Sequence, residues 1–246
     1  MRKHLVWVLG LALAIGIANV AVGANFQKIT GEFKPNTNLS KTKYKAGSVN
    51  VITETGDNDG DVSPAIRAQV SFDDDLTFFT RGVPTCKESD LTQTTTAQAK
   101  AKCGKSQVGA GAATIALAGN PDPAASTPAV VTAFNGVPKN GKPVILLHAR
   151  ADAFGNTSVL VGVLNKLGRR GDFGWRLDVK IPELAFGSAI TRFQVKVNKK
   201  FRFKGKRRSY VSGRCSDGNK KLNYKGTFTF NGSPAKTATD GQPCSR

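Results

Sequence analysis

The chain has 246 residues, of which 39% are hydrophobic and 8% aromatic, and its formal net charge is +19. Because the apolar residues recur along the whole length, this composition argues against a disordered protein and allows one all-β domain or two small domains. The charge favours contact with anionic material.

The first 24 residues are typical of an export signal. A basic start precedes an apolar run from Leu5 to Val22, which closes on Gly23-Ala24, a small-residue pattern that signal peptidases accept. The alternative is an uncleaved N-terminal anchor. No other long apolar run follows, so we expect no membrane span after the signal. We predict a signal peptide over 1–24, and secretion to the extracellular space or the cell envelope.

Alternation with a period of two recurs along the chain and predicts half-buried strands. A shift of one residue would place charged side chains in the core, so the register of these strands is well specified. In chain order, the inward sets are Val49, Val51 and Thr53; Ile66, Ala68, Val70 and Phe72; Leu177, Val179 and Ile181; Phe193, Val195 and Val197; and Leu222, Tyr224, Gly226, Phe228 and Phe230.

Dipeptides that tolerate positive φ predict tight turns between strands. They are Asn135-Gly136, Asn140-Gly141, Asp217-Gly218 and Asn231-Gly232. Three further segments, Val144–Arg150, Ser158–Leu164 and Trp175–Ile181, are joined by connections too short for crossover helices, so they should run antiparallel. The exception is 91–102, where Ala, Gln and Lys permit a short helix although four threonines weaken it.

About a dozen short strands without a parallel-sheet pattern predict an all-β fold. We expect an antiparallel β-sandwich, or a closed, barrel-like sandwich, with at most one short helix near 91–102. No linker or low-complexity tract divides the chain, and the stretch from Gly119 to Pro128 is an ordinary long loop. A single domain over 25–246 is therefore expected.

The four cysteines favour two disulfides. Four cysteines allow three pairings, and proximity favours Cys86–Cys103 with Cys215–Cys244 without proving it. An exported chain meets an oxidising compartment, where disulfides persist. The alternative, a zinc site, lacks the close cysteine or histidine pairs that such sites favour.

Several short strings resemble segments of uncharacterised, exported, β-rich proteins of actinomycete-type bacteria. The resemblance spans most of 25–246, carries no catalytic motif, and implies a cell-envelope or extracellular protein. The strings are Gly82–Cys86 with Cys103, Val108–Gly111, Thr132–Gly136, Leu146–Ala149, Leu177–Pro182, and Lys204–Lys206 with Ser209–Cys215.

The charge is unevenly distributed. From Arg192 to Lys225 there are thirteen basic residues against one acid, whereas from Val51 to Asp90 nine acids face three bases. On a sheet, the outward residues of the basic segment would form a stripe that attracts polyanions. The predicted anion-binding residues are Arg192, Lys196, Arg202, Lys204, Lys206, Arg207 and Arg208.

Three interpretations of this stripe remain open. It could be a solvated surface that keeps edge strands unpaired, or it could bind anionic envelope polymers or lipid head groups. Nucleic acid is disfavoured by export and by the lack of a recognised binding motif. The opposite charge of 51–90 also suggests head-to-tail self-association, or pairing of acidic and basic strands within one chain.

Catalytic and metal motifs are sparse, so we predict no catalytic residue, metal or cofactor. A Ser-His-Asp site would depend on His148, which shares a strand face with Leu146 and is expected to be structural. Glu183 could line a glycosidase cleft, but no motif surrounds it. Asp57–Asp61 and Asp73–Asp75 could bind calcium, or could be charged turns.

Together these features predict an exported, non-catalytic envelope or extracellular protein that binds anionic polymers or lipid head groups. The alternative is a carbohydrate-active enzyme, a glycan hydrolase, on a β-sandwich scaffold; this rests on fold analogy alone.

Overall fold

The computed structural model describes residues 26–56, 63–117, 126–168, 171–184, 188–216, 221–231 and 233–246. The expected signal peptide and the Asp217-Gly218 turn lie outside these residues. The strands are β1 (Phe26–Lys34), β2 (Lys45–Gly56), β3 (Ala65–Asp73), β4 (Leu76–Phe78), β5 (Gln107–Ala116), β6 (Thr127–Lys139), β7 (Lys142–Ala151), β8 (Asn156–Lys166), β9 (Phe173–Lys180), β10 (Ala189–Val197), β11 (Lys200–Phe203), β12 (Lys206–Ser209), β13 (Val211–Gly213), β14 (Lys221–Phe230) and β15 (Lys236–Pro243). The helical elements are α1 (Thr96–Cys103) and the 3-10 turns η1 (Glu88–Asp90), η2 (Gly104–Ser106) and η4 (Asp152–Phe154).

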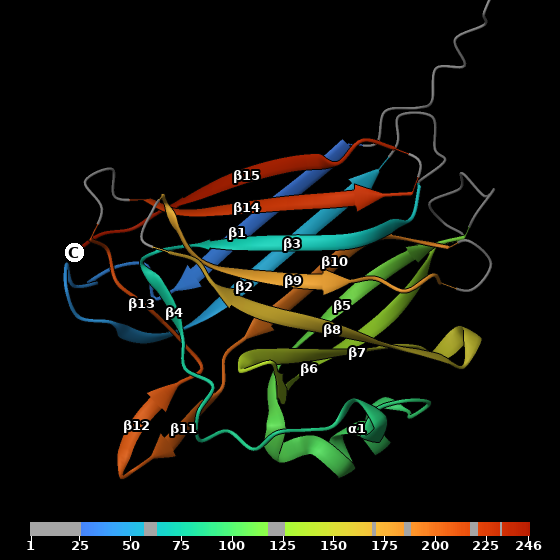
Figure 1. Ribbon diagram of the computed structural model, residues 1–246, viewed down its shortest axis with the longest axis horizontal. Coiled ribbons are helices and arrows are strands. Elements are labelled where there is room, and N and C mark those ends of the chain that lie inside the picture. Colours follow the sequence, from blue (N-terminus) through green and yellow to red (C-terminus); the bar gives the residue numbers. More distant parts are fainter. Residues whose placement is uncertain are drawn as a thin grey trace, which may run out of the picture.

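Within the described residues, thirteen strands form one antiparallel sheet, which confirms the all-β prediction. The order is β15-β14-β3-β9-β8-β7-β6-β5-β10-β2-β13-β4, with β1 beside β2, and β11 and β12 form a separate pair. The sheet folds back on itself, so that β3, β9, β8 and β7 cross in front of β1, β2, β10 and β5 at a steep angle (Figure 1). The core lies between these two layers.

The edge strands β1 and β15 of the folded sheet meet through side chains instead of a backbone ladder. The carboxylate of Asp240 accepts a hydrogen bond from the Gly31 N–H, at 2.8 Å. The amide of Gln242 accepts from the Phe33 N–H and donates to the Phe33 carbonyl, at 2.7 and 3.1 Å. The sequence leaves open a β-sandwich or a closed, barrel-like sandwich. The structure shows one continuous sheet, and the side-chain hydrogen bonds between β1 and β15 form a seam that we call the side-chain seam.

The inward faces follow the predicted alternation with one exception. The inward side chains of β14 are all buried, and those of β2, β9 and β10 face the space between the layers. Ile66 was expected inside, but it is 45% exposed. A β-bulge in the pairing of β14 with β3 places Ala65 opposite Phe230 and turns Ile66 outward, so this part of the prediction is wrong.

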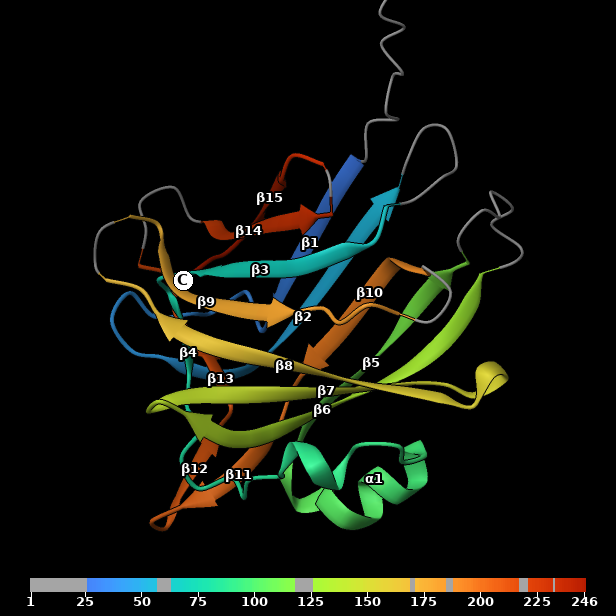
Figure 2. The same ribbon diagram turned by 45° about the vertical axis from the view of Figure 1, so that its right-hand side comes forward.

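The segment between β4 and β5 crosses the outside of the sheet and covers β6 and β7 (Figure 2). The predicted short helix is confirmed as α1. It begins later than expected, because the Thr95 side chain accepts a hydrogen bond from the Gln98 N–H while the Gln98 side chain accepts one from the Thr95 N–H. Leu91 and Ala99 pack against Phe134 on the outer face of β6. The central strands are therefore buried on both faces.

One predicted turn is wrong. Asn140-Gly141 does turn from β6 into β7, with φ of 50° and 73°, as expected for a tight hairpin. Asn135-Gly136, in contrast, lies inside β6 and is buried. The Asn135 amide donates to the Val83 carbonyl at 2.9 Å and its oxygen accepts from the Tyr210 hydroxyl at 3.0 Å, so a buried polar network holds this dipeptide in a strand.

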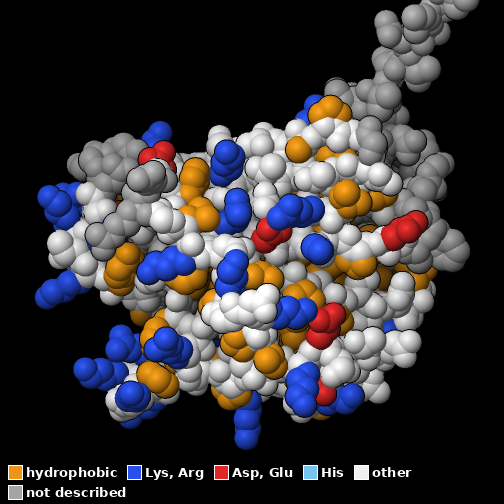
Figure 3. Space-filling model, viewed as in Figure 1, with side chains coloured by type: hydrophobic (Ala, Val, Ile, Leu, Met, Phe, Trp, Pro, Cys, Tyr) orange, Lys and Arg blue, Asp and Glu red, His pale blue; other side chains and the backbone are white. Residues whose placement is uncertain are grey.

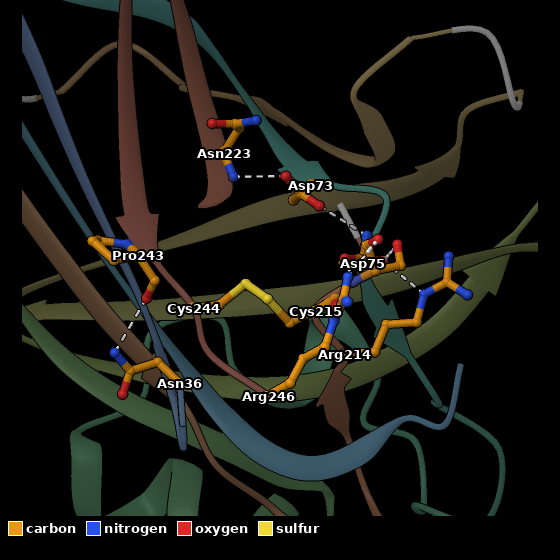
Figure 4. The surroundings of a disulfide bond; sticks show 10 residues. Asn36, Asp73, Asp75, Arg214, Cys215, Asn223, Pro243, Cys244 and Arg246 are labelled. Carbon is orange, nitrogen blue, oxygen red and sulfur yellow. Dashed lines mark hydrogen bonds and ion pairs between the residues drawn. A yellow bond between two sulfur atoms is a disulfide. The ribbon is translucent and has the colours of Figure 1, made fainter. Parts of the chain in front are cut away.

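Both disulfides have the predicted pairing. Cys86–Cys103 closes a loop of 17 residues around η1 and α1, and Cys215–Cys244 closes one of 29 residues at the C-terminus. Each is expected to contribute roughly 3 kcal/mol by restricting the unfolded chain. The second disulfide lies beside a network of buried carboxylates (Figure 4). Two disulfides indicate folding in an oxidising compartment outside the cytoplasm.

Candidate functional site

The predicted anion-binding residues gather mainly on a hairpin that projects from the sheet. We call residues Lys200–Ser209, which comprise β11, β12 and their turn, the basic finger (Figure 1). Lys204 and Gly205 form the turn with φ of 48° and 74°, the left-handed region that a two-residue hairpin turn needs. The register pairs Phe201 with Arg208, Arg202 with Arg207, and Phe203 with Lys206.

Aromatic packing fixes the base of the basic finger. The ring of Phe79 stacks on Phe201 at 6.0 Å and meets Phe203 edge-on at 5.5 Å. Gly82 lies under Phe203, where a Cβ atom would approach the ring to 2.3 Å, so only glycine permits this contact. These contacts hold one face of the hairpin against the segment that follows β4.

Hydrogen bonds attach the end of β12 to the main sheet. The Ser209 hydroxyl donates to the Gly47 carbonyl at 2.8 Å, and the Tyr210 N–H donates to the Lys199 carbonyl at 2.8 Å. The buried Tyr210 hydroxyl is bonded to Asn135, and burial raises the pKa of this phenol. The basic finger is therefore firmly attached and not a free loop.

The basic finger carries a dense set of exposed cations. They are Lys200, Arg202, Lys204, Lys206, Arg207 and Arg208, all exposed. Lys and Arg side chains gather at the corresponding place in the space-filling view, at the lower left (Figure 3). None of the ion pairs formed within the described residues includes any of these six cations.

One feature of the basic finger opposes its own stability. Arg202 and Arg207 lie directly opposite each other in the ladder, an arrangement of like charges that destabilises a hairpin. Only weak compensation comes from the aromatic rings, since Arg208 lies 5.4 Å from the Phe79 ring centre and Lys204 lies 5.8 Å from that of Phe203.

The other two predicted anion-binding residues lie on β10. Arg192 is 3.5 Å from the Glu54 carboxylate on β2 and also donates to Gln194, so its charge is partly compensated. Lys196 is exposed near the end of β10 that leads into the basic finger. The structure thus places five of the seven predicted residues on the basic finger and two on β10, where Arg192 is paired with an acidic residue.

Acidic and basic segments pair within the chain at two places. Besides Arg192 with Glu54, Arg214 donates to the buried Asp75 carboxylate at 2.6 Å (Figure 4). The Ser216 N–H and hydroxyl also donate to Asp75. The intramolecular alternative for the acidic segment is therefore observed.

Asp73–Asp75 forms the predicted turn between β3 and β4. The carboxylate oxygens of its three residues lie within 4.8 Å of one another. However, the Asp75 carboxylate is bonded as described, and the Asp73 carboxylate accepts from the N–H groups of Asp75 and Asn223, at 2.9 and 2.7 Å (Figure 4). Burial raises the pKa of Asp73 to about 7, despite the opposing effect of these donors. The turn acts as an acceptor for protein donors; the other calcium candidate, Asp57–Asp61, lies outside the described residues.

His148 is fully buried beneath the segment that leads into α1. Its Nε2 lies 3.0 Å from the Thr94 carbonyl, which assigns the proton to Nε2, and Nδ1 has no hydrogen-bond partner. Burial lowers the pKa of His148. The residue anchors Thr94 to β7, as its shared face with Leu146 predicts.

The glutamates that the sequence offered for catalysis are exposed or form ion pairs with cations. Glu183 is exposed beyond the end of β9, whereas Glu32, Glu54 and Glu88 form ion pairs with Lys34, Arg192 and Lys139. A second group with metal-ligand potential contains Asp90 and the sulfurs of the first disulfide, which are already bonded to each other.

Sequence reasoning missed the interior of the folded sheet, which contains two adjoining cavities of about 90 and 190 Å³. The only signal in the sequence was the set of small residues on β5 and β7. In the part of the chain that the structure describes, no helix is long and apolar enough to cross a membrane. Comparisons with family models, curated proteins and solved structures found no match for this chain.

Proposed function

We propose that this chain is an exported, non-catalytic protein of the cell envelope or extracellular space that binds anionic groups through the basic finger. The groups are the phosphates or carboxylates of an envelope polymer, or of lipid heads. The observation that supports this most is a firmly attached hairpin with six exposed cations and no ion pair within the described residues.

The repulsion between Arg202 and Arg207 is the physical basis of this proposal. Like charges in direct opposition lower the stability of a hairpin. On a surface that binds no ligand, nothing would offset this loss of stability. A multivalent anion placed between the two guanidinium groups would remove the repulsion and accept bidentate hydrogen bonds from both. Function at the expense of local stability is common at binding sites.

The aromatic contacts at the base of the basic finger also support anion binding there. Phe79, Phe201 and Phe203 hold the ladder in place, so that little order is lost when an anion binds. Because the cations surround a projecting tip, they could reach a flat anionic surface or a flexible polymer.

The experiment that tests this proposal is binding of the secreted protein to three probes. They are vesicles of anionic phosphatidylglycerol, vesicles of neutral phosphatidylcholine, and soluble inorganic polyphosphate. Binding to an anionic probe that weakens as salt rises from about 0.05 M to about 0.5 M supports the proposal. The two anionic probes separate lipid heads from polymer phosphates.

A variant with all six finger cations changed to Gln serves as the decisive comparison. It should lose binding to the anionic probe while it keeps the same unfolding temperature as the parent protein. Equal binding by this variant, or binding that salt does not change, would contradict the proposal.

A further inference from the structure

The interior of the folded sheet holds the strongest feature that the basic finger does not use. A deep cavity of about 90 Å³ lies between the two layers, and its wall comes from β2, β3, β4, β7, β8, β9, β10 and β14. An outer cavity of about 190 Å³ adjoins it. Leu160 and Ile190 line both cavities, so the two adjoin each other, and we call them together the lumen.

The wall of the deep cavity is almost entirely aliphatic or aromatic. Among the described residues, the polar side chains in this wall are those of Thr53 and Thr55, and the Thr55 hydroxyl already donates to the Gln27 side chain at 2.7 Å. A water molecule in a protein interior needs two to four polar partners, and this wall does not supply them. The deep cavity is therefore suited to an apolar group.

The lining of the outer cavity becomes more polar toward solvent. Asn156 and Ser158 on β8 line it together with Phe154, which is 48% exposed in the turn between β7 and β8 at the right of Figure 1. No charged side chain of the described residues lines either cavity. The lumen thus runs from an apolar end to an uncharged polar mouth.

Small side chains on two facing strands create this space. Ala113 on β5 and Ala149 and Ala151 on β7 line the outer cavity. Their ladder partners on β10 and β8 are larger, namely Phe193, Ser158 and Asn156. Larger residues at these positions would fill the lumen, as is usual in a close-packed core.

The lumen is long as well as apolar. On β2 the lining runs from Val49 to Thr55, and on β10 from Ile190 to Val197. At about 3.3 Å per residue these stretches measure roughly 20 Å. The hydrocarbon chains of one bilayer leaflet extend over about 15 Å, half of the roughly 30 Å core. A single extended alkyl chain of that leaflet length is therefore shorter than these stretches and fits along them.

We propose that the lumen binds one unbranched alkyl chain of a single-chain lipid, with the tail in the deep cavity and the polar head at the mouth beside Asn156 and Ser158. This site is separate from the basic finger, because the described residues that line the two cavities include none from Lys200–Ser209.

The probe is 1-dodecanol, with 1-octanol and 1-decanol for comparison, titrated into the secreted protein by calorimetry. Burial of each methylene should raise the affinity about fourfold until the chain fills the lumen. Equal affinity for octanol and dodecanol would mean that only a short group enters, and would overturn the chain assignment. Lack of saturable binding would overturn the site itself.

Trp175 reports where the tail lies, because it packs edge-on at 5.8 Å against Phe78, which lines the deep cavity. Bromine quenches tryptophan fluorescence on contact, and Trp175 is the single tryptophan of 25–246. 12-Bromododecanol should therefore quench Trp175, whereas unbrominated dodecanol should not. Binding without quenching would place the tail elsewhere and contradict the proposed orientation.

Ser158→Phe places a ring in the outer cavity and should lower the affinity for dodecanol at least tenfold. Val130→Phe adds the same ring to the outer face of β6, where Val130 is 46% exposed, and should leave the affinity unchanged. If Ser158→Phe does not fold, Ala149→Leu narrows the same cavity with a smaller change. Unchanged affinity in a folded lumen variant would contradict the site.

Discussion

Neutralising the opposed arginines of the basic finger should weaken anion binding without weakening the fold. The change is Arg202→Gln with Arg207→Gln, which keeps the aliphatic stems and removes both charges. Each Lys or Arg near an anionic membrane surface contributes about 1 kcal/mol of binding free energy. Loss of two such charges should therefore weaken binding by about 2 kcal/mol, or roughly 30-fold.

The effect on stability has the opposite sign. Because the two guanidinium groups lie opposite each other in the ladder, their repulsion costs roughly 0.2–1 kcal/mol of folding free energy. Both side chains are exposed, so solvent screening places the value near the lower end. The double variant should unfold at the same denaturant concentration as the parent protein or at a slightly higher one.

The assay combines vesicle or polyphosphate binding at low salt with equilibrium unfolding in urea. The control is Lys166→Gln with Lys180→Gln, which removes two exposed charges from β8 and β9 and changes the net charge equally. This control should bind within about threefold of the parent protein, since only non-specific attraction changes. Equal losses of binding in the two double variants would refute a site at the finger, and a destabilised finger variant would refute the repulsion.

Three further predictions concern buried polar groups. A folded-state pKa of His148 below its ordinary value means that stability falls as pH drops below about 6.5, and His148→Gln should flatten urea midpoints measured from pH 7 to 5. Asp73 has a raised pKa of about 7, so the stability that it contributes is present below about pH 4 and is lost as pH rises toward 7. The stability of Asp73→Asn relative to the parent protein should therefore be higher at pH 8 than at pH 5. Gln242→Ala leaves the Phe33 N–H and carbonyl without partners, and should cost roughly 1–3 kcal/mol in urea unfolding and speed hydrogen exchange at Phe33, whereas unchanged exchange would contradict the side-chain seam.

Local patterns in the sequence predicted the elements that depend on local chemistry. Period-two alternation located the central strands, and chain proximity indicated the cysteine pairs. Asn140-Gly141 turns with the positive φ values that its local chemistry favours. Asn135-Gly136 has the same local chemistry but lies in a strand, because contacts with Val83 and Tyr210, distant in the sequence, satisfy the Asn135 side chain.

Other features depend on long-range geometry that no window of sequence contains. The β-bulge that turns Ile66 outward arises from pairing with β14, more than 150 residues away. The compensation of Arg192 by Glu54 requires β10 beside β2. The predicted anion-binding residues therefore lie mainly on a hairpin instead of along one face of the sheet. The lumen depends on the sheet folding back on itself, which local sequence patterns do not indicate.

The basic finger as an anion-binding site is the central claim, and a salt titration of binding tests it most directly. The protein should bind phosphatidylglycerol vesicles or polyphosphate at about 0.05 M salt and release them by about 0.5 M, since attraction between exposed charges is screened over that range. The variant with all six finger cations changed to Gln should not bind either probe even at about 0.05 M salt. Lack of binding to both probes at low salt, or retention at high salt, would contradict it.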